Sequence, residues 1–168
     1  MATSTSDIAL RLAIPEDIEA LRHVYATSVK ALAQGHYSIE QIAVWAGYAE
    51  APAFVDFILE PLTILATVDR QPIGFCGVEP TGHIASLYVY PDHGRRGIGT
   101  ALLREALDRC ATPTRGHWFV EASLLSRPVF ERLGFAQVAI EQTERAGVRF
   151  ERLLMRRAWA PRRSDDAT

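Results

Sequence analysis

The sequence predicts a single domain of the mixed α/β (α+β) class, with elements in the order β-α-α-β-β-β-α-β-α-β-β. Its length of 168 residues suits one domain that buries its own core, since domains typically hold roughly 100–200 residues. A hydrophobic share of 48% and a charged share of 23% are those of an ordinary globular protein. The spacing of apolar residues alternates between helix and strand periods along the chain, which indicates helices packed on a sheet.

The N-terminal part of the chain predicts one strand followed by three helices. Residues 8–14 alternate apolar and polar side chains, which is the pattern of a half-buried strand. Pro15 in the first turn and Gly35 as the stop delimit a long helix. Ser38, followed three residues later by Gln41, forms a capping-box pattern that predicts the start of another helix. The second and third helices are expected at residues 39–46 and after Pro52.

Three strands follow, and together they predict an antiparallel meander. Residues 63–69, 73–79 and 83–90 are rich in apolar and β-branched side chains, and short turns with proline or glycine separate them. The third of these strands has apolar or aromatic residues on both of its faces. Because such a strand is covered on both sides, we expect it at the centre of the sheet.

The C-terminal half predicts two further helices and three strands. A glycine- and arginine-rich loop at residues 92–97 leads into an amphipathic helix whose apolar stripe runs from Ile98 to Cys110. The elements expected after it are a strand at 118–122, a short helix at 126–133 that Gly134 ends, and an antiparallel hairpin of residues 135–143 and 148–155. We therefore expect one domain over residues 8–157, with flexible ends at 1–7 and 158–168.

The charge and hydropathy of the chain argue against two kinds of partner. A formal net charge of −2 lacks the basic excess of a nucleic-acid-binding protein. No apolar run approaches the ~18 residues that a membrane span needs, and the N-terminus lacks the order of a signal peptide. We therefore expect neither nucleic acid nor membrane as a partner, and a cytoplasmic location.

Residue counts narrow the chemistry further. Cys76 and Cys110 form neither a disulfide framework nor a metal-ligand set, so we expect two buried thiols and no metal. Lys30 is the single lysine among 18 basic residues, and it lies in a helical pattern without a glycine-rich context. P-loop enzymes and pyridoxal enzymes each need a lysine in their site, so both classes are disfavoured.

The turn between the third strand of the meander and the helix after it carries the clearest chemical signal. Amides at a helix N-terminus point outward and carry roughly half a positive charge. Gly97 and Gly99 have no Cβ to keep an anion away from these amides, and Arg95 and Arg96 add charge beside them. The turn is therefore suited to a pyrophosphate, with a plain strand-to-helix turn as the alternative.

Two nucleotide-binding templates fit this segment poorly. A Rossmann fingerprint requires a small residue where Leu102 stands, although an acidic residue, Glu121, does follow at about the right distance. The motif also falls in mid-chain, after an antiparallel meander. The spacing from Gly94 to Gly99 is that of a P-loop, but Thr100 occupies the position of the essential lysine.

A third template fits this segment better. Residues 87–103 resemble the acyl-CoA signature of the GNAT (GCN5-related N-acetyltransferase) superfamily, which is Gln/Arg-x-x-Gly-x-Gly/Ala after a strand that ends in Val-x-Pro. Gly97 and Gly99 match the two later positions, as does the Ala-Leu-Leu that follows them. Gly94 departs from the pattern, because the family has Gln or Arg there, and the neighbouring Arg95 is the residue that can compensate.

Two other segments extend the resemblance over roughly residues 8–157. Residues 121–135 resemble the later motif of the family, a strand followed by a short helix that ends in Gly-Phe. Residues 35–45 resemble a bacterial subgroup of small single-domain members with a Tyr-Ser-x-Glu-Gln-x-x-x-Trp segment. The resemblance implies the GNAT fold and acetyl-CoA as co-substrate. It also implies a monomer or homodimer that transfers acetyl to a primary amine of a small-molecule or peptide acceptor by direct attack on the thioester.

The resemblance implies a cofactor site along the third strand of the meander and the turn after it. The pyrophosphate is expected on the turn and the pantetheine along the strand edge, which a splayed strand at 118–122 leaves free. The Leu87 amide is implied as the oxyanion donor. The implied cofactor residues are Leu87, Tyr88, Val89, Gly94, Arg95, Arg96, Gly97, Ile98, Gly99, Thr100, Ser126 and Phe130.

The resemblance also places the proton-transfer groups. The family often uses a carboxylate near the start of this strand as base, which makes Glu79 and His83 the candidates, and a histidine pKa of ~6.5 suits this role. Phe130 stands where many relatives have a tyrosine that protonates the leaving thiolate. Because a thiol has a pKa of ~8.5, coenzyme A can leave as the thiolate at modest cost. The other hydroxyl candidates are Tyr88, Ser123 and Ser126.

The acceptor is expected between the first two helices and the central strands. Tyr25, His36, Tyr37 and Trp45 are the candidate lining residues, and core packing is the alternative for aromatic residues on amphipathic helices. The sequence leaves the acceptor open among peptides, aminoglycosides, amino acids and small amines. Phe130 also leaves a second function open, that of a catalytically weak acyl-CoA-binding sensor.

Overall fold

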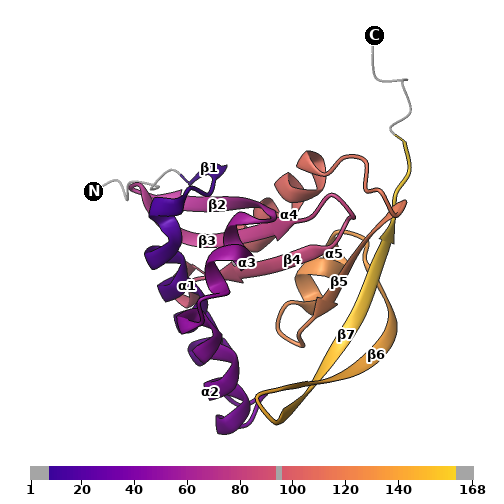
Figure 1. Ribbon diagram of the computed structural model, residues 1–168. Helices are drawn as coiled ribbons and strands as arrows, with labels where there is room; N and C mark the ends of the chain where they lie inside the picture. The colour runs from indigo at the N-terminus through magenta and orange to yellow at the C-terminus, as the bar shows by residue number, and fades with distance from the viewer. Residues whose placement is uncertain (1–7, 94–95, 162–168) are drawn as a thin grey trace.

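The computed structural model describes residues 8–93 and 96–161, which form two antiparallel sheets with helices packed around them (Figure 1). The first sheet has the strand order β1-β2-β3-β4, and the second has the order β5-β7-β6. The strands are β1 (Ala9–Leu12), β2 (Leu62–Val68), β3 (Gln71–Val78), β4 (Ile84–Val89), β5 (His117–Ala122), β6 (Ala136–Arg145) and β7 (Val148–Ala158). The predicted class is confirmed, and the order of elements matches the prediction once the short helix expected after Pro52 is counted before β2.

Helices cover both faces of the first sheet, with α1 (Ile18–Leu32) and α3 (Phe54–Leu59) on one face and α4 (Ile98–Arg109) on the other. Of the other helices, α2 (Ile39–Gly47) packs on α1 and near β7, and α5 (Arg127–Arg132) packs on α4. The predicted capping box is confirmed, because Gln41 N donates to Ser38 Oγ at 3.0 Å and Ser38 N donates to Gln41 Oε1 at 2.9 Å. None of the helices in the described ranges has the length and apolar character of a membrane-crossing segment.

The core lies on the two faces of the first sheet. On one face Leu102 of α4 is fully buried against the sheet, beside Cys76 of β3. On the other face Tyr25 of α1 packs near Phe75 of β3. Burial raises the pKa of the Cys76 thiol, whereas Cys110 is half-buried, and both cysteines are free. The expected pair of buried thiols is thus one fully buried and one half-buried residue.

The two sheets meet at the start of β4 and then separate. His83 and Phe119 form a single parallel bridge, and Phe119 N donates to the Gly82 carbonyl at 3.0 Å. Beyond this joint no ladder connects β4 with β5 in the described structure, so β4 is an edge strand and its neighbour is splayed as expected. The expectation of a central strand is wrong, because α1 and α4 cover the faces of β4 while its edge stays unpaired. Apolar residues on both faces of a strand indicate that other elements cover these faces, but they do not indicate that both edges of the strand are hydrogen-bonded to neighbouring strands.

The hairpin of β6 and β7 crosses the molecule and closes one side of this splay. Its tip lies beside α2 (Figure 1), where Gln41 Nε2 donates to the Arg149 carbonyl at 2.8 Å. β7 continues to Ala158, one residue past the expected domain boundary, and Trp159 N then donates to the Gly116 carbonyl at 3.3 Å. The hairpin thereby links the C-terminal sheet to the N-terminal helices.

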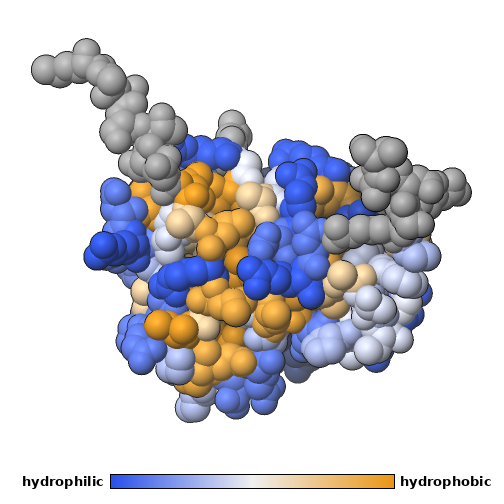
Figure 2. All heavy atoms as spheres, turned by 90° about the horizontal axis from the view of Figure 1, so that it is seen from above, coloured by the Kyte–Doolittle hydropathy of each residue, from blue (hydrophilic) through white to orange (hydrophobic). Residues whose placement is uncertain are grey.

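The opposite edge of the first sheet is formed by β1. Its apolar side chains are exposed, including Leu10 and Leu12. The view from above shows hydrophobic surface in this region next to charged residues (Figure 2). The unpaired β4 edge lies at the other side of the same sheet, so the two edges have different surroundings.

Candidate active site

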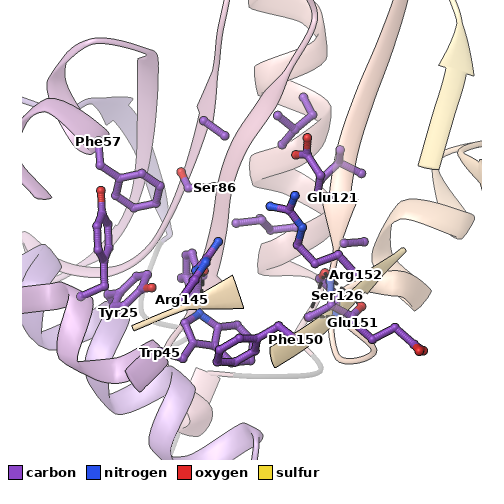
Figure 3. A pocket seen from close by; sticks show the side chains of 18 of the residues that line it. Tyr25, Trp45, Phe57, Ser86, Glu121, Ser126, Arg145, Phe150, Glu151 and Arg152 are labelled. Carbon is purple, nitrogen blue, oxygen red and sulfur yellow. Dashed lines mark hydrogen bonds between the residues drawn. The ribbon is translucent and has the colours of Figure 1, made fainter. Parts of the chain in front are cut away.

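The splay between β4 and β5 opens into a cavity of about 620 Å³. Its walls come from α1, α2, β4, β5, α5 and the β6–β7 hairpin (Figure 3). Tyr25, Tyr37 and Trp45 all line it, in the region where the sequence places the acceptor. His36 does not line it, because this residue lies exposed in the turn after α1.

Aromatic side chains from the helices pack against the cavity side of β4. The rings of Tyr25 and Tyr88 lie 4.5 Å apart between centroids, and Trp45 Nε1 donates to Tyr88 Oη at 3.2 Å. Tyr37 packs edge-on to Trp45 at 5.2 Å, and its hydroxyl accepts a hydrogen bond from Leu124 N. Burial raises the pKa of Tyr25 and Tyr88, so both hydroxyls stay neutral at physiological pH.

The edge of β4 that faces β5 has free backbone amides. Tyr90 N donates to the Ile73 carbonyl of β3 at 2.8 Å. Because alternate residues of a strand direct their amides to opposite edges, Leu87 and Val89 direct theirs away from β3. The Ser28 hydroxyl of α1 lies 2.6 Å from the Val24 carbonyl and 2.8 Å from the Val89 carbonyl, so its single proton can go either to its own helix or to the end of β4. Ser28 was not among the candidates expected from the sequence, although a polar serine on the buried face of a helix is a signal that could have marked it.

The two candidate bases lie together, joined by a third residue. His83 Nδ1 lies 3.1 Å from Glu79 Oε2, and His83 Nε2 lies 2.6 Å from Glu121 Oε2. Burial lowers the pKa of His83, but hydrogen bonds and charges from Glu121 and Glu79 raise it by more, so it stands above its ordinary value. The hydrogen bond from His83 in turn lowers the pKa of Glu121. His83 and Glu121 line the cavity, and Glu79 is not among its described lining residues.

The glycine turn follows directly on β4. Gly94 and Arg95 lie outside the described residues. Arg96 is exposed, and Gly97 is the N-cap of α4 with φ of +76°. The side chain of Ile98 is buried in the core, so only its backbone amide is offered to a ligand. Thr100 is half-buried in the first turn of α4.

Gly99 lies in the first turn of α4, one residue after Ile98. A Cβ on Gly99 would lie 3.7 Å from Val129 of α5, at ordinary contact distance, so the protein itself leaves room for a small side chain here. The expectation that a side chain at Gly99 enters the path of the phosphates stays a prediction.

Comparison with known proteins places the chain in a family. A model of the acetyltransferase (GNAT) domain matches residues 33–156. This chain belongs to the GNAT acetyltransferase family. It is 30% identical to a protein of Escherichia coli (strain K12) named uncharacterized N-acetyltransferase YafP, over 90% of this chain and 96% of that protein. The predicted GNAT resemblance is therefore confirmed, and the protein is an acyltransferase.

Solved GNAT structures share the fold over nearly the whole chain. A GCN5-related N-acetyltransferase from Rhodopseudomonas palustris matches with a TM-score of 0.85 at 28% identity, covering 94% of this chain and 98% of that one. PaiA N-acetyltransferase from Thermoplasma acidophilum, in complex with coenzyme A, matches with a TM-score of 0.72 at 22% identity. That match covers 91% of this chain and 99% of that one.

The α5 region of this GNAT domain contributes two of the predicted cofactor residues to the cavity wall. Ser126 and Phe130 both line the cavity. Ser123 N donates to Ser126 Oγ at 3.1 Å, and the two serine hydroxyls lie 3.2 Å apart, so they hydrogen-bond each other where α5 begins. Phe130 is buried with its ring 5.2 Å from that of Phe135. The position therefore offers apolar contact and no proton.

Several residues that line this GNAT site were not among the candidates expected from the sequence. Glu121 entered only as an acid at Rossmann spacing, and its contact with His83 joins residues 38 positions apart. Arg145, Glu151 and Arg152 reach the cavity from the hairpin (Figure 3). The alternation of apolar and polar residues along β6 and β7 predicts that they form a hairpin. It does not predict which part of the molecule the hairpin packs against, so no signal in the sequence assigns these three residues to the cavity.

Proposed function

We propose that this enzyme transfers the acetyl group of acetyl-CoA to a primary amine that enters the cavity beside β4. The observation that carries the proposal is the unpaired β4 edge, with free Leu87 and Val89 amides and the glycine turn of α4 at its end. The described complex of the Thermoplasma acidophilum relative with coenzyme A supports the cofactor class. The proposed acceptor is a small-molecule or peptide amine.

The cofactor is proposed to extend the first sheet as an added strand. Amides of Leu87 and Val89 bond the pantetheine, which replaces the missing neighbour of β4. The Leu87 amide also donates to the thioester oxygen as negative charge develops there, an effect typically worth ~3 kcal/mol. The pyrophosphate takes the N-terminus of α4, with Arg96 and the amides of residues 97–100. Gly94 and Arg95 keep this role as a prediction.

The reaction is a direct acyl transfer. The amine nitrogen attacks the carbonyl carbon, a C–N bond forms, and the C–S bond breaks with its electron pair leaving on sulfur. One proton leaves the amine, and coenzyme A departs as the thiolate, which needs no general acid because its pKa is ~8.5. Phe130 then supports the pantetheine end by apolar contact and takes no part in proton transfer.

The proton acceptor is proposed to be the pair of His83 and Glu121. Glu121 lines the cavity and carries a full negative charge, so it orients an incoming ammonium group. In the neutral tautomer whose Nδ1–H donates to Glu79, His83 has a free lone pair on Nε2, 2.6 Å from Glu121 Oε2. The amine proton passes to the Glu121 carboxylate and from there to Nε2, which leaves His83 as the imidazolium and Glu121 charged again. Glu79 is proposed as a positioning residue, since it approaches the other ring nitrogen at 3.1 Å.

Release of coenzyme A with a panel of primary amines tests the proposed function. The expected result is amine-dependent thiol release that His83→Gln reduces by ~100-fold or more, with little change in affinity for acetyl-CoA. Saturable binding of acetyl-CoA without thiol release for any amine would favour the sensor function instead. Absence of acetyl-CoA binding would contradict both functions.

A further inference from the structure

Two arginines of the cavity wall take no part in the proposed transfer. Arg145 ends β6 and Arg152 lies on β7, and both side chains reach the cavity from the hairpin (Figure 3). They lie at different ends, since Arg145 is drawn beside Tyr25 and Trp45, whereas Arg152 extends toward Glu121. The two guanidinium groups therefore have different neighbours, and these neighbours determine whether each group is free to bind a ligand.

Arg152 already has a protein partner. Its Nη2 donates to Glu141 Oε2 at 2.6 Å, and its charge contributes to the lowered pKa of Glu121. Its Nε is buried without a hydrogen-bond partner among the described residues. The charge of Arg152 is therefore balanced by carboxylates of the protein, and its Nε–H is left for a ligand. Such a residue can add a hydrogen bond to a bound anion, but it is not suited to be the main anion-binding group.

Arg145 has no ion pair among the described residues, and its environment suits an anion. Its charge acts on the hydroxyls of Tyr25 and Tyr88, two groups that burial keeps neutral. Trp45 Nε1 donates to Tyr88 Oη at 3.2 Å, so the indole N–H is already used and holds the Tyr88 hydroxyl in place. The Arg145 guanidinium and two neutral tyrosine hydroxyls therefore form one cluster here, and none of these groups carries negative charge.

Two carboxylates of the described structure also line the cavity. Glu121 binds His83, and Glu151 accepts a hydrogen bond from the neutral Gln142 Nε2 at 3.0 Å, which leaves its charge in place. A polycationic acceptor would therefore meet, among the described lining residues, two arginines and only two carboxylates, one of which is held by His83. Flat apolar walls complete the cavity, among them Phe57 and Phe150 (Figure 3).

We infer that the acceptor is an amine that also carries a carboxylate, bound by Arg145, and an apolar or aromatic body enclosed by the rings of the cavity. The inference rests on the proposed function and names the substrate class within it. A charge-assisted guanidinium–carboxylate contact in such a site is worth about tenfold or more in affinity. Amino acids with aromatic side chains have this combination of groups, whereas polyamines and aminoglycosides do not.

Binding to the protein loaded with coenzyme A tests the inference without turnover. The probes are 3-phenylpropionate and its neutral isostere 3-phenylpropanamide, titrated by calorimetry. The carboxylate is expected to bind at least tenfold more tightly than the amide, and Arg145→Gln is expected to remove this difference. Arg149→Gln is the matched control, because Arg149 is exposed on the same hairpin, as Arg145 is, but does not line the cavity.

Each contrary outcome overturns a stated part of the inference. Equal affinity of the two probes, or no binding of the carboxylate, overturns the anionic subsite. A preference that survives Arg145→Gln but is lost in Arg152→Gln overturns the assignment to Arg145. Thermal melting of the variants without ligand verifies that each one is folded.

Turnover separates this inference from the proposed function. Release of coenzyme A with phenylalanine is expected to exceed that with phenethylamine, its decarboxylated counterpart, by about tenfold or more in kcat/KM. The reverse preference overturns the inference while the acetyltransferase function stands. Failure of the protein to bind coenzyme A in the first place counts against the proposed function alone.

Discussion

At the residue scale, His83 has the most unusual surroundings of the candidate site. Each ring nitrogen lies within hydrogen-bond distance of a carboxylate, at 2.6 Å for Glu121 and 3.1 Å for Glu79. Its ring also stacks on Phe119, with centroids 5.0 Å apart. Burial favours the neutral ring, but the two carboxylates favour the imidazolium more strongly, so the pKa lies above the ordinary ~6.5. The neutral form needed to accept a proton therefore becomes dominant only at higher pH.

The pH dependence of the rate follows from this balance. Because His83 accepts a proton only when neutral, kcat is expected to rise with pH along a limb centred above ~6.5. Glu79→Gln removes one carboxylate that raises the pKa of His83, so this limb moves to lower pH. His83→Gln removes the limb and costs ~100-fold or more.

Rate–pH profiles of the wild type and the two variants check this prediction. The affinity for acetyl-CoA is the control, since it is expected to stay unchanged in both variants. A wild-type limb that persists in His83→Gln would mean that solvent or another group accepts the proton.

The glycine turn permits a second prediction at the residue scale. Gly97 has φ of +76° as N-cap of α4, a conformation that costs other residues ~1–2 kcal/mol. A turn that rearranges to relieve this strain moves the amides that face the pyrophosphate. Gly97→Ala is expected to weaken acetyl-CoA binding by about tenfold, as measured by calorimetry.

Gly99→Ala is the matched comparison for the glycine turn. The added Cβ meets Val129 at 3.7 Å, an ordinary contact, so the loss of affinity is expected to be smaller than in Gly97→Ala. A larger loss of acetyl-CoA affinity in Gly99→Ala than in Gly97→Ala would mean that the phosphates lie close to Gly99 itself, so that its added methyl group obstructs them.

At the scale of elements, the joint between β4 and β5 decides the shape of the site. Among the described residues, backbone pairing between the two strand starts is limited to the bridge of His83 with Phe119 and the hydrogen bond from Phe119 N to the Gly82 carbonyl. From this closed end the strands diverge, which frees the β4 edge and creates the cavity. Gly82 lies at the joint with φ of +98°, where a Cβ would overlap the His117 carbonyl oxygen.

Gly82→Ala therefore tests the importance of the joint. Steric overlap with backbone and the strained φ together are expected to lower the free energy of unfolding by about 2–4 kcal/mol, as measured by urea denaturation. Gly116→Ala is the control, because Gly116 also has a positive φ but an added Cβ there meets nothing within 4 Å. Equal losses in the two variants would show that overlap at the joint is unimportant.

At the scale of the whole molecule, the proposed cofactor site draws on both sheets. The β4 edge belongs to the first sheet, while β5, α5 and the hairpin wall belong to the C-terminal half. A ligand that fills the space between them stabilises the folded state, because unfolding separates all of its contacts at once.

Coenzyme A is accordingly expected to raise the melting temperature. At a concentration a hundredfold above Kd it adds ~2.7 kcal/mol to the free energy of unfolding. Differential scanning calorimetry measures this shift, and NAD serves as the control ligand for the disfavoured dinucleotide alternative. A shift with NAD and none with coenzyme A would contradict the proposed cofactor.

The sequence by itself determined the elements, their order and the family. Local spacing carries that information: the capping box at Ser38 and Gln41 marks the start of α2, and Gly97 and Gly99 mark the turn before α4. Signals of this kind depend on residues within a few positions of one another in the chain. At such short range the geometry of the helix or turn fixes which face or backbone group each side chain reaches.

Only the tertiary structure decided how those elements meet. Periodicity indicates that both faces of β4 are covered, but it cannot tell that its edge is unpaired, because pairing depends on where β5 diverges. The contact of His83 with Glu121 and the effect of the Arg145 charge on the Tyr88 hydroxyl also depend on the path of the chain in space. Such contacts join residues far apart in the chain, and the chain path that brings them together is set by packing of the whole core.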